Sequence, residues 1–425
     1  MYLWLRASST TISGSGSISA EWLARQPFHD GQVNMKGSSD GGFSAPQVAS
    51  THLPLRLLNQ LPDELERSET RNSPCQNGRD GTVSLPRKGL LRLLRLYKGL
   101  RSTYRGSDVT RRVRRFDGWT GRASASEGPK GYEHAETVRE YYDLFSELMV
   151  FGWGESLHFA PLSPRESLED SQIRHQRLMI SKLELRDGMT VVDVGCGIGG
   201  PMRRVVREAG VRVLGVNYSE LQLAKARSLD AEAGLDHMVD YLAASFMDMG
   251  AIEDDTYDRA YAIESTCHAP DKVGAFTEIY RVLKPGSLFW GQEMCMTDRF
   301  DPHDSRHQAI KQDLMHGIAL KEIATTGEVD AALATAGFEF VEGMDRAVDE
   351  TRPSKPWYQP MAARIRMQNL KAHIGMAGLA EALRVLPKGT KDAVKVLDRT
   401  AGAYVAGGRT GIFTPLYCFL ARKPL

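Results

Sequence analysis

The fold is decided by the stretch Thr190-Val-Val-Asp-Val-Gly-Cys-Gly-Ile-Gly-Gly-Pro201, in which an apolar strand runs into a glycine-rich turn. An unbroken run of β-branched residues is typical of a parallel strand that is covered on both faces. Gly195, Gly197 and Gly199 let the backbone bend sharply and approach a ligand closely, because no Cβ stands in the way. A purely structural tight turn is the alternative interpretation.

The ligand predicted for this turn is a nucleoside without a phosphate. The turn lacks the Gly-Lys-Ser/Thr ending of a P-loop, and its glycines are spaced more tightly than in the dinucleotide fingerprint. The next apolar strand, 211–217, ends in Asn217, and open α/β sheets bind the ribose of a nucleoside at such a strand end. Asn217 could instead cap the following helix, a role for which Ser219 is an equally good candidate.

Strands and helices alternate regularly through the middle of the chain, which predicts a doubly wound, mostly parallel sheet of the α/β class. The signal Lys284-Pro-Gly286 should end the helix that precedes the fifth strand. The predicted strands are 190–195, 211–217, 239–244, 257–263, 287–293, 338–341 and 412–420, and the predicted helices include 138–149, 165–185, 202–209 and 272–283.

Length and composition exclude several classes of protein. A chain of 425 residues fits one catalytic domain with extensions, and a net charge of +1 implies no general attraction to nucleic acid. The five cysteines are scattered without the spacing of zinc ligands, so we expect no metal site and no disulfide framework. No apolar run approaches the roughly 18 residues of a membrane span.

The N-terminal part divides into two segments of different character. Residues 1–85 are rich in Ser, Gly, Asn and Pro and are predicted to be a disordered tail, with organelle import as an alternative. Residues 86–130 contain 13 Lys and Arg against 3 Asp and Glu. Within them, residues 89–101 carry a basic side chain every third position with Leu between, which suits a membrane surface with anionic lipid. Packing of the leucines on the catalytic domain, or a targeting role, is equally compatible.

Five side chains are candidates for chemistry. Glu264 and His268 follow the strand 257–263. Glu293 and Asp298 are expected at the end of the strand 287–293 and just after it, which brings them to the same edge of the sheet. Trp153, before the sheet, could belong to a lid over the site. The plain alternatives are a hydrogen-bonded loop histidine, a helix-capping glutamate and a packed core tryptophan.

The set of motifs resembles the sterol 24-C-methyltransferase family, and the likeness runs in one order from about residue 136 to the C-terminus. Single motifs occur in other proteins, but the whole set is highly specific. The stretches that carry it are Phe151-Gly-Trp-Gly154, Asp193-Val-Gly-Cys-Gly-Ile-Gly-Gly-Pro201, Tyr261-Ala-Ile-Glu-Ser-Thr-Cys-His-Ala-Pro270, Cys295-Met-Thr-Asp298 and Phe413-Thr-Pro-Leu-Tyr-Cys-Phe-Leu-Ala-Arg-Lys-Pro424.

The resemblance implies a class I, Rossmann-like methyltransferase with a seven-stranded sheet, in which residues 136–300 bind S-adenosylmethionine and residues 301–425 form a helical C-terminal sterol-methyltransferase region. It further implies a sterol substrate, a peripheral position on the cytosolic face of the endoplasmic reticulum membrane and, as an option, a homo-oligomer. The residues it assigns to the donor are Asp193, Gly195, Cys196, Gly197, Gly199, Asn217, Ser245, Phe246 and Glu264.

The implied reaction adds a methyl group to the side-chain double bond of the sterol. Because an alkene is a weak nucleophile, alignment with the sulfonium methyl must supply much of the rate. The resulting carbocation can be stabilised by aromatic faces, with Trp153 as the leading candidate. Proton loss then needs one positioned base. Glu264, His268, Glu293 and Asp298 all remain candidates for that base.

The chain departs from the family pattern on the acceptor side. Leu148 to Val150 stand where aromatic and acidic residues are usual, Gln292 and Met294 replace two more aromatics, and Ser245 replaces an acid near the adenine. Residues 315–319 also replace an acidic Gly-Asp-Gly stretch. These changes keep two alternatives open. The chain could methylate another isoprenoid, such as a linear triterpene or a prenylquinol, or it could be an inactive lipid- or donor-binding relative.

Overall fold

A computed structural model of the chain describes residues 86–119, 134–348, 354–364 and 367–425. Its described residues contain one seven-stranded sheet with the strand order β3-β2-β1-β4-β5-β7-β6. The strands are β1 Thr190–Val194, β2 Arg212–Asn217, β3 Val239–Ala243, β4 Tyr257–Ile263, β5 Leu283–Met296, β6 Glu339–Asp345 and β7 Phe413–Arg422. The first five strands pair in parallel, and β7 is antiparallel to both of its neighbours. The predicted mostly parallel, seven-stranded sheet is confirmed. The predicted tail, 1–85, lies outside the described residues.

Helices cover both faces of the sheet, as the alternating pattern predicted. One face packs Met179, Val205 and Leu223 from α6, α7 and α8, and the other packs Phe276 and Leu333 from α9 and α11. These five helices span α6 Leu168–Lys182, α7 Gly200–Ala209, α8 Glu220–Ala233, α9 Lys272–Val282 and α11 Thr326–Thr335.

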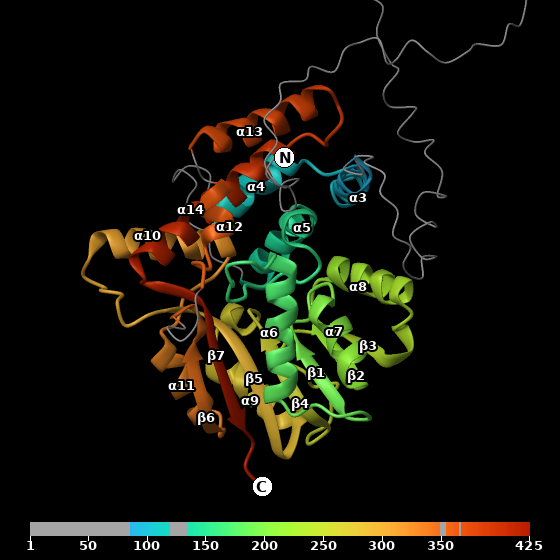
Figure 1. Cartoon of the computed structure of the whole chain (residues 1–425), viewed down its shortest axis with the longest axis vertical. Coiled ribbons are helices and arrows are strands. Elements are labelled where there is room, and N and C mark those ends of the chain that lie inside the picture. Colours follow the sequence, from blue (N-terminus) through green and yellow to red (C-terminus); the bar gives the residue numbers. More distant parts are fainter. Residues whose placement is uncertain (1–85, 120–133, 349–353, 365–366) are drawn as a thin grey trace, which may run out of the picture. The chain divides into compact units, whose positions relative to one another are not determined.

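The remaining helices gather beyond the carboxyl ends of the parallel strands (Figure 1). They are α3 Pro86–Thr103, α4 Val109–Trp119, α5 His134–Trp153, α10 Ser305–Ile318, α12 Gln359–Arg364, α13 Met367–Ala382 and α14 Thr390–Thr410, and the short 3-10 turns are Asp236–Met238, Thr266–His268 and Arg346–Val348. A third apolar core joins α4, α5, α10 and α14 to the ends of the strands. Residues 301–425 thus supply both β6 and β7 of the sheet and part of this helical layer.

The basic segment is folded onto the rest of the chain between residues 86 and 119. In α3, Leu100 is fully buried and Leu96 packs against the core, while Arg92, Arg95 and Lys98 are exposed. In α4, Phe116 is fully buried. Of the interpretations left open above, packing on the catalytic domain is the one observed for these side chains. Among the described residues, no helix combines the length and apolar character needed to cross a membrane.

The prediction for the fifth strand was too short. Helix α9 ends at Val282, but β5 begins at once with Leu283 and continues through the Lys284-Pro-Gly286 signal to Met296. A register shift against β4 between Tyr257 and Arg259 accommodates this start. The strand is long because β7 pairs with it over its second half, which local sequence patterns do not reveal.

Candidate functional site

The glycine turn is anchored to the neighbouring strand and leaves one side open. The N–H groups of Gly195 and Cys196 both donate to the carbonyl of Val216, at 2.9 and 3.1 Å. Gly195, Gly197 and Gly199 have φ values of 85°, 56° and 75°, so all three are left-handed. A Cβ on Gly195 would lie 2.3 Å from that of Ser265, whereas a Cβ on Gly197 would meet nothing within 4 Å.

A pocket lies between this turn, the ends of β2 and β4, and α5; it is called the loop pocket below. Eight of the predicted site residues line it, namely Asp193, Gly195, Cys196, Gly197, Asn217, Phe246, Glu264 and His268. Five others do not: Gly199, Ser245, Trp153, Glu293 and Asp298. Lining residues that the sequence did not single out include Tyr142, Glu155, His158, Tyr218 and Gln222.

Asp193 is a buried carboxyl at the end of β1. It is 3% exposed, and its Oδ2 atom accepts no hydrogen bond from the described residues. Burial raises the pKa of Asp193 to about 7, against the opposing effect of the neighbouring Tyr261 hydroxyl. A buried acceptor beside a pocket is the arrangement expected of a group that binds a ligand.

Asn217 and Gln222 form a pair at the end of β2. The Asn217 amide donates to Gln222 Oε1 at 2.9 Å and to the Gly197 carbonyl at 3.3 Å. The cap of α8 is Ser219, whose hydroxyl accepts from the Gln222 N–H. Asn217 is therefore not the side-chain cap of this helix, and it lines the loop pocket from the strand end.

On the side expected for the adenine, only one of two adjacent residues reaches the pocket. Phe246 is buried and lines it. Ser245 is exposed, and its hydroxyl accepts from the Met247 N–H at 3.1 Å. The hydroxyl of Ser245 thus supports the local turn.

Glu264 follows β4 in a left-handed conformation, with φ of 52°, and its carboxyl is buried. Its Oε1 atom accepts from the Phe159 N–H and from Gln292 Nε2, both at 2.6 Å. Burial raises the pKa of Glu264 well above its usual range, although both hydrogen bonds act to lower it. Nearby, His268 Nε2 lies 3.1 Å from the Tyr142 hydroxyl.

Glu293 and Asp298 are not brought to the pocket, contrary to the placement predicted for them. Glu293 lies within β5, fully buried, where it pairs with Lys272 Nζ at 3.0 Å and bonds the Thr266 hydroxyl. Asp298 follows β5 and lines a second pocket together with Thr297 and Arg299. Glu293 directly follows Gln292, which pairs with Ile263 at the end of β4, and side chains alternate along a strand, so Glu293 faces Lys272 of α9 on the other side of the sheet. Asp298 lies beyond the end of β5 at Met296.

Trp153 is packed at the end of α5. Its indole N–H donates to the His158 carbonyl at 2.9 Å, and its ring meets Phe159 edge-on at 5.1 Å. Trp153 therefore supports the segment that carries Phe159, the backbone donor to Glu264. Trp153 thus has the packing role of the alternative interpretation, and it does not line the pocket.

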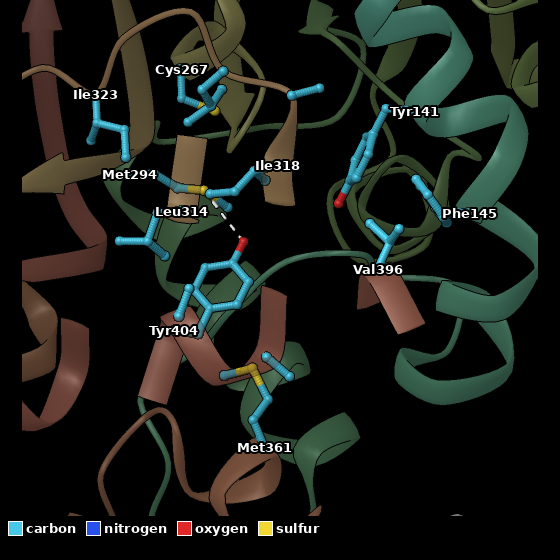
Figure 2. Close-up of a cluster of buried hydrophobic side chains, with 14 of the residues drawn as sticks. Tyr141, Phe145, Cys267, Met294, Leu314, Ile318, Ile323, Met361, Val396 and Tyr404 are labelled. Atoms are coloured by element: carbon cyan, nitrogen blue, oxygen red, sulfur yellow. Dashed lines mark hydrogen bonds between the residues drawn. The ribbon is translucent and has the colours of Figure 1, made fainter. Parts of the chain in front are cut away.

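An apolar cluster lies next to this site, on the side of the helices beyond the sheet edge. Figure 2 shows Tyr404 facing Met294, with Tyr141 and Phe145 of α5 across from them. The Tyr404 hydroxyl contacts Met294 Sδ at 3.8 Å. Cys267, from the Glu264 loop, belongs to the same cluster. Aromatic side chains thus border the site from α5 and α14, although residues 148–150 lack them.

The described residues contain no group of three or more His, Cys, Asp or Glu side chains that could hold a metal ion. The loop pocket thus offers exposed backbone at the glycine turn, two buried carboxyl groups, a hydrogen-bonded histidine–tyrosine pair and apolar walls.

The family model for a methyltransferase domain matches residues 192–291, and the model for the sterol methyltransferase C-terminal region matches residues 365–425. The chain is 39% identical over 326 residues to cycloartenol-C-24-methyltransferase of Arabidopsis thaliana, covering 75% of this chain and 96% of the plant protein.

It is also 34% identical over 331 residues to a sterol 24-C-methyltransferase of Saccharomyces cerevisiae, covering 74% of this chain and 85% of the yeast protein. Among solved structures, a cyclopropane synthase from Mycobacterium tuberculosis aligns with a TM-score of 0.53 at 18% identity, covering 68% of this chain and 98% of that one. This last likeness shows a shared class I methyltransferase fold.

Proposed function

The chain belongs to the sterol 24-C-methyltransferase family, and from that premise we propose that it transfers a methyl group from S-adenosylmethionine to the side-chain double bond of a sterol, with Glu264 as the base. The observation that carries the proposal is the loop pocket. This pocket combines the open side of the glycine turn with a buried carboxyl. It lies beside an apolar cluster built from α3, α4, α5, α10, α12, α14, β5 and β7.

The residues present fit the methyl donor. The open side of Gly197 leaves room for a ligand close to the backbone, and the buried Oδ2 of Asp193 can accept a hydrogen bond from an ammonium group. Asn217 and Gln222 offer amide groups to a ribose diol, and Phe246 offers an apolar face to a base. When bound, S-adenosylmethionine supplies an electrophilic methyl group.

The acceptor side of the site fits an apolar alkene. Tyr142 and His268 line the loop pocket. Buried rings form an aromatic wall beside them: Tyr141 packs edge-on against Tyr142 at 5.1 Å, and Phe159 packs edge-on against Tyr404 at 5.0 Å. Such a wall excludes water and fixes the orientation of an isoprenoid side chain, which provides the alignment that a weak nucleophile needs. Ring faces also stabilise a developing positive charge without reacting with it.

Of the four candidate bases, Glu264 and His268 border the pocket, and Glu264 is the better placed. Burial makes its carboxylate a stronger base than one in water. His268 already shares Nε2 with the Tyr142 hydroxyl, so we assign it to holding that ring. Neither Glu293 nor Asp298 lines the loop pocket, and Glu293 is held in an ion pair with Lys272.

The proposal is tested with the purified full chain, labelled S-adenosylmethionine and a panel of Δ24-sterols, squalene and prenylquinols in detergent. Mass spectrometry should find a methylated sterol, and Glu264→Gln should lower its formation by about 10²-fold or more while donor binding is kept. Product from squalene or a prenylquinol alone would identify another isoprenoid as the acceptor. Donor binding without any product would contradict an enzymatic role.

We further propose that the protein contacts the cytosolic face of the endoplasmic reticulum membrane through charge. Arg92, Arg95, Lys98 and Arg101 of α3 are exposed, whereas Leu96 and Leu100 of the same helix pack toward the core. The apolar face that would enter the lipid is thus partly used for folding. The basic stripe that remains suits the headgroups of anionic lipids.

A further inference from the structure

Gln292 connects four segments of the chain beneath the loop pocket. It lies in β5 and is completely buried. Its Nε2 atom donates to Glu264 Oε1 at 2.6 Å, and it reaches the carbonyls of Pro415 at 3.0 Å and Phe159 at 3.2 Å. Its Oε1 atom lies 2.7 Å from His175 Nε2. The side chain therefore meets α6, the loop after β4, the segment before α6, and β7.

The contacts fix which way the amide points. With Nε2 facing three oxygens, a flipped amide would set Oε1 against all three of them. His175 must then donate through Nε2–H to Gln292 Oε1. Burial lowers the pKa of His175 to about 3, so this imidazole is neutral and can hold its proton on that nitrogen. The orientation of Gln292 is thus determined by its neighbours.

The arrangement makes the two oxygens of Glu264 unequal. Both donors, the Phe159 N–H and Gln292 Nε2, reach the same atom, Oε1. Oε1 therefore acts as an acceptor whether Glu264 is ionised or not, since a proton placed there would face two donors. Any proton that Glu264 takes up must go to Oε2.

We propose that Gln292 is a positioning residue, which holds Oε1 of Glu264 as a permanent acceptor so that Oε2 is the atom that receives the proton from the methylated substrate. The inference rests on the proposed function of Glu264. In that step a C–H bond of the side-chain cation breaks, its electron pair forms the new C=C bond, and the proton passes to the Oε2 of the ionised carboxylate.

Among the described groups around Glu264, only Gln292 and the Phe159 N–H act to stabilise its ionised carboxylate. Glu293 acts to raise the pKa of Glu264 and is itself paired with Lys272. Burial keeps the neighbouring tyrosines, cysteines and two of the histidines neutral near pH 7, because it raises the pKa of the tyrosines and cysteines and lowers the pKa of these histidines. These groups are Tyr141 and Tyr142 on α5, Tyr404 on α14, Cys267 on the same loop, Cys418 on β7, His175 on α6 and His158 before it; His268 also lies on that loop.

The test compares Gln292→Met with Gln172→Met. Gln172 is also a buried glutamine, 3% exposed, and its amide donates to the carbonyls of Ser156 and His158. Among the described residues it makes no hydrogen bond to Glu264. Loss of Gln292 removes one donor from the ionised carboxylate, so the acid limb of the kcat/KM profile should move up by about one to two pH units. kcat should fall, while KM for the donor stays the same. Gln172→Met should leave the limb in place, and an unmoved limb in Gln292→Met, or an equal shift in both, would overturn the proposal.

A second measurement does not depend on turnover. The infrared carbonyl band of the protonated Glu264 carboxyl, assigned by its absence from Glu264→Gln, is titrated in the resting protein. It should persist to higher pH in Gln292→Met, or in the shorter amide Gln292→Asn if the first variant does not fold. The same titration midpoint as the wild type would refute the role of Gln292. If the wild type methylates no sterol, the proposed function fails, and this titration still decides the positioning role.

Discussion

Gly195 and Gly197 are both left-handed, but the space beside each serves a different purpose. The space at Gly195 is taken by Ser265, whereas the space at Gly197 is open to the loop pocket. We expect Gly197→Ala to cost about 1–2 kcal/mol of unfolding free energy, from left-handed strain alone, and to lower donor affinity by about tenfold or more. Urea unfolding and calorimetric titration with S-adenosylmethionine measure the two effects.

Gly234 provides the matched control for this substitution. It caps α8 with φ of 67°, and a Cβ there would meet nothing within 4 Å, as at Gly197, but it does not line the loop pocket. Gly234→Ala should therefore cost a similar amount of stability and leave donor affinity unchanged. Equal affinities in the two variants would remove the ligand-binding role of Gly197.

Asp193 should make the donor-free protein less stable as the pH rises. Its pKa is about 7 in the folded chain against about 3.9 when unfolded, so between these values the unfolded state has released a proton that the folded state keeps. The free energy of unfolding then falls across this window, by roughly 4 kcal/mol in total. Asp193→Asn removes the penalty and should be more stable than the wild type at pH 8, with little difference at pH 4.

Asp258 offers a control of opposite sign. Burial acts to raise the pKa of Asp258, but Lys284 and the hydrogen bonds from Thr190 outweigh it, so the pKa is lowered. The carboxylate therefore stabilises the folded state above the pKa of the unfolded chain, and this contribution is lost as the pH falls through the lower pKa of the folded chain. Asp258→Asn should be destabilised most at pH 8. Urea midpoints at pH 4, 6 and 8 measure both variants. A decline with pH that survives in Asp193→Asn would show that another group causes it.

The predicted site residues succeeded where the backbone decides position and failed where the side chain does. Asp193, Asn217 and Glu264 lie at or just after the ends of strands that meet at one edge, so strand boundaries alone placed them at the pocket. Glu293 was misplaced because side chains alternate along β5: Gln292 faces His175 of α6, so the next residue, Glu293, faces Lys272 of α9 on the other side of the sheet. Tyr142 was missed because helical spacing does not tell which of two adjacent tyrosines faces a pocket.

At the scale of elements, α4 is part of the folded core. Phe116 is completely buried and packs its ring against Tyr141 and Phe145 of α5 and against His316 of α10, with centroids 5.6 to 6.0 Å apart. Arg112 adds a two-point ion pair to Glu140 on α5. We expect Phe116→Ala to lower the free energy of unfolding by about 3–5 kcal/mol, because the cavity lies between three helices.

The exposed Arg111 on the same helix supplies the comparison. Arg111→Ala should change stability by no more than about 0.5 kcal/mol. If Phe116→Ala unfolded at the same urea concentration as Arg111→Ala, α4 would not be part of the cooperative unit.

The sheet and the positions of most of its strands could be predicted from the sequence. The surfaces against which the amphipathic helices pack could not. Continuous apolar strands such as β1 and β2 carry their own signal, because both faces are buried. The apolar face of residues 89–101 does not indicate what covers it, because leucines are equally suited to contact with lipid and to packing against α5. Only the tertiary contacts of Leu96 and Leu100 separate the two outcomes.

At the scale of the whole molecule, the segment 86–130, which contains α3, is distinguished by its positive charge. The net charge of the protein is only +1, yet residues 86–130 carry a net charge of +10. Within α3, the exposed Arg92, Arg95, Lys98 and Arg101 follow one another at three-residue intervals. Because the leucines between them face inward in part, any attraction of this surface to a membrane is mainly electrostatic and should weaken with salt.

Vesicle co-sedimentation tests this arrangement in the full chain. Replacing Arg92, Arg95, Lys98 and Arg101 of α3 with Gln should lower partitioning onto vesicles with anionic lipid by roughly 10²- to 10³-fold at low salt, at about 1 kcal/mol for each charge lost. Neutral vesicles should bind both proteins weakly, and the difference should shrink in high salt. The control neutralises four exposed basic residues elsewhere, Arg186, Arg207, Arg212 and Lys321, and should bind like the wild type. If the control lost as much binding as the α3 variant, the attraction would follow net charge, and the stripe would have no special role.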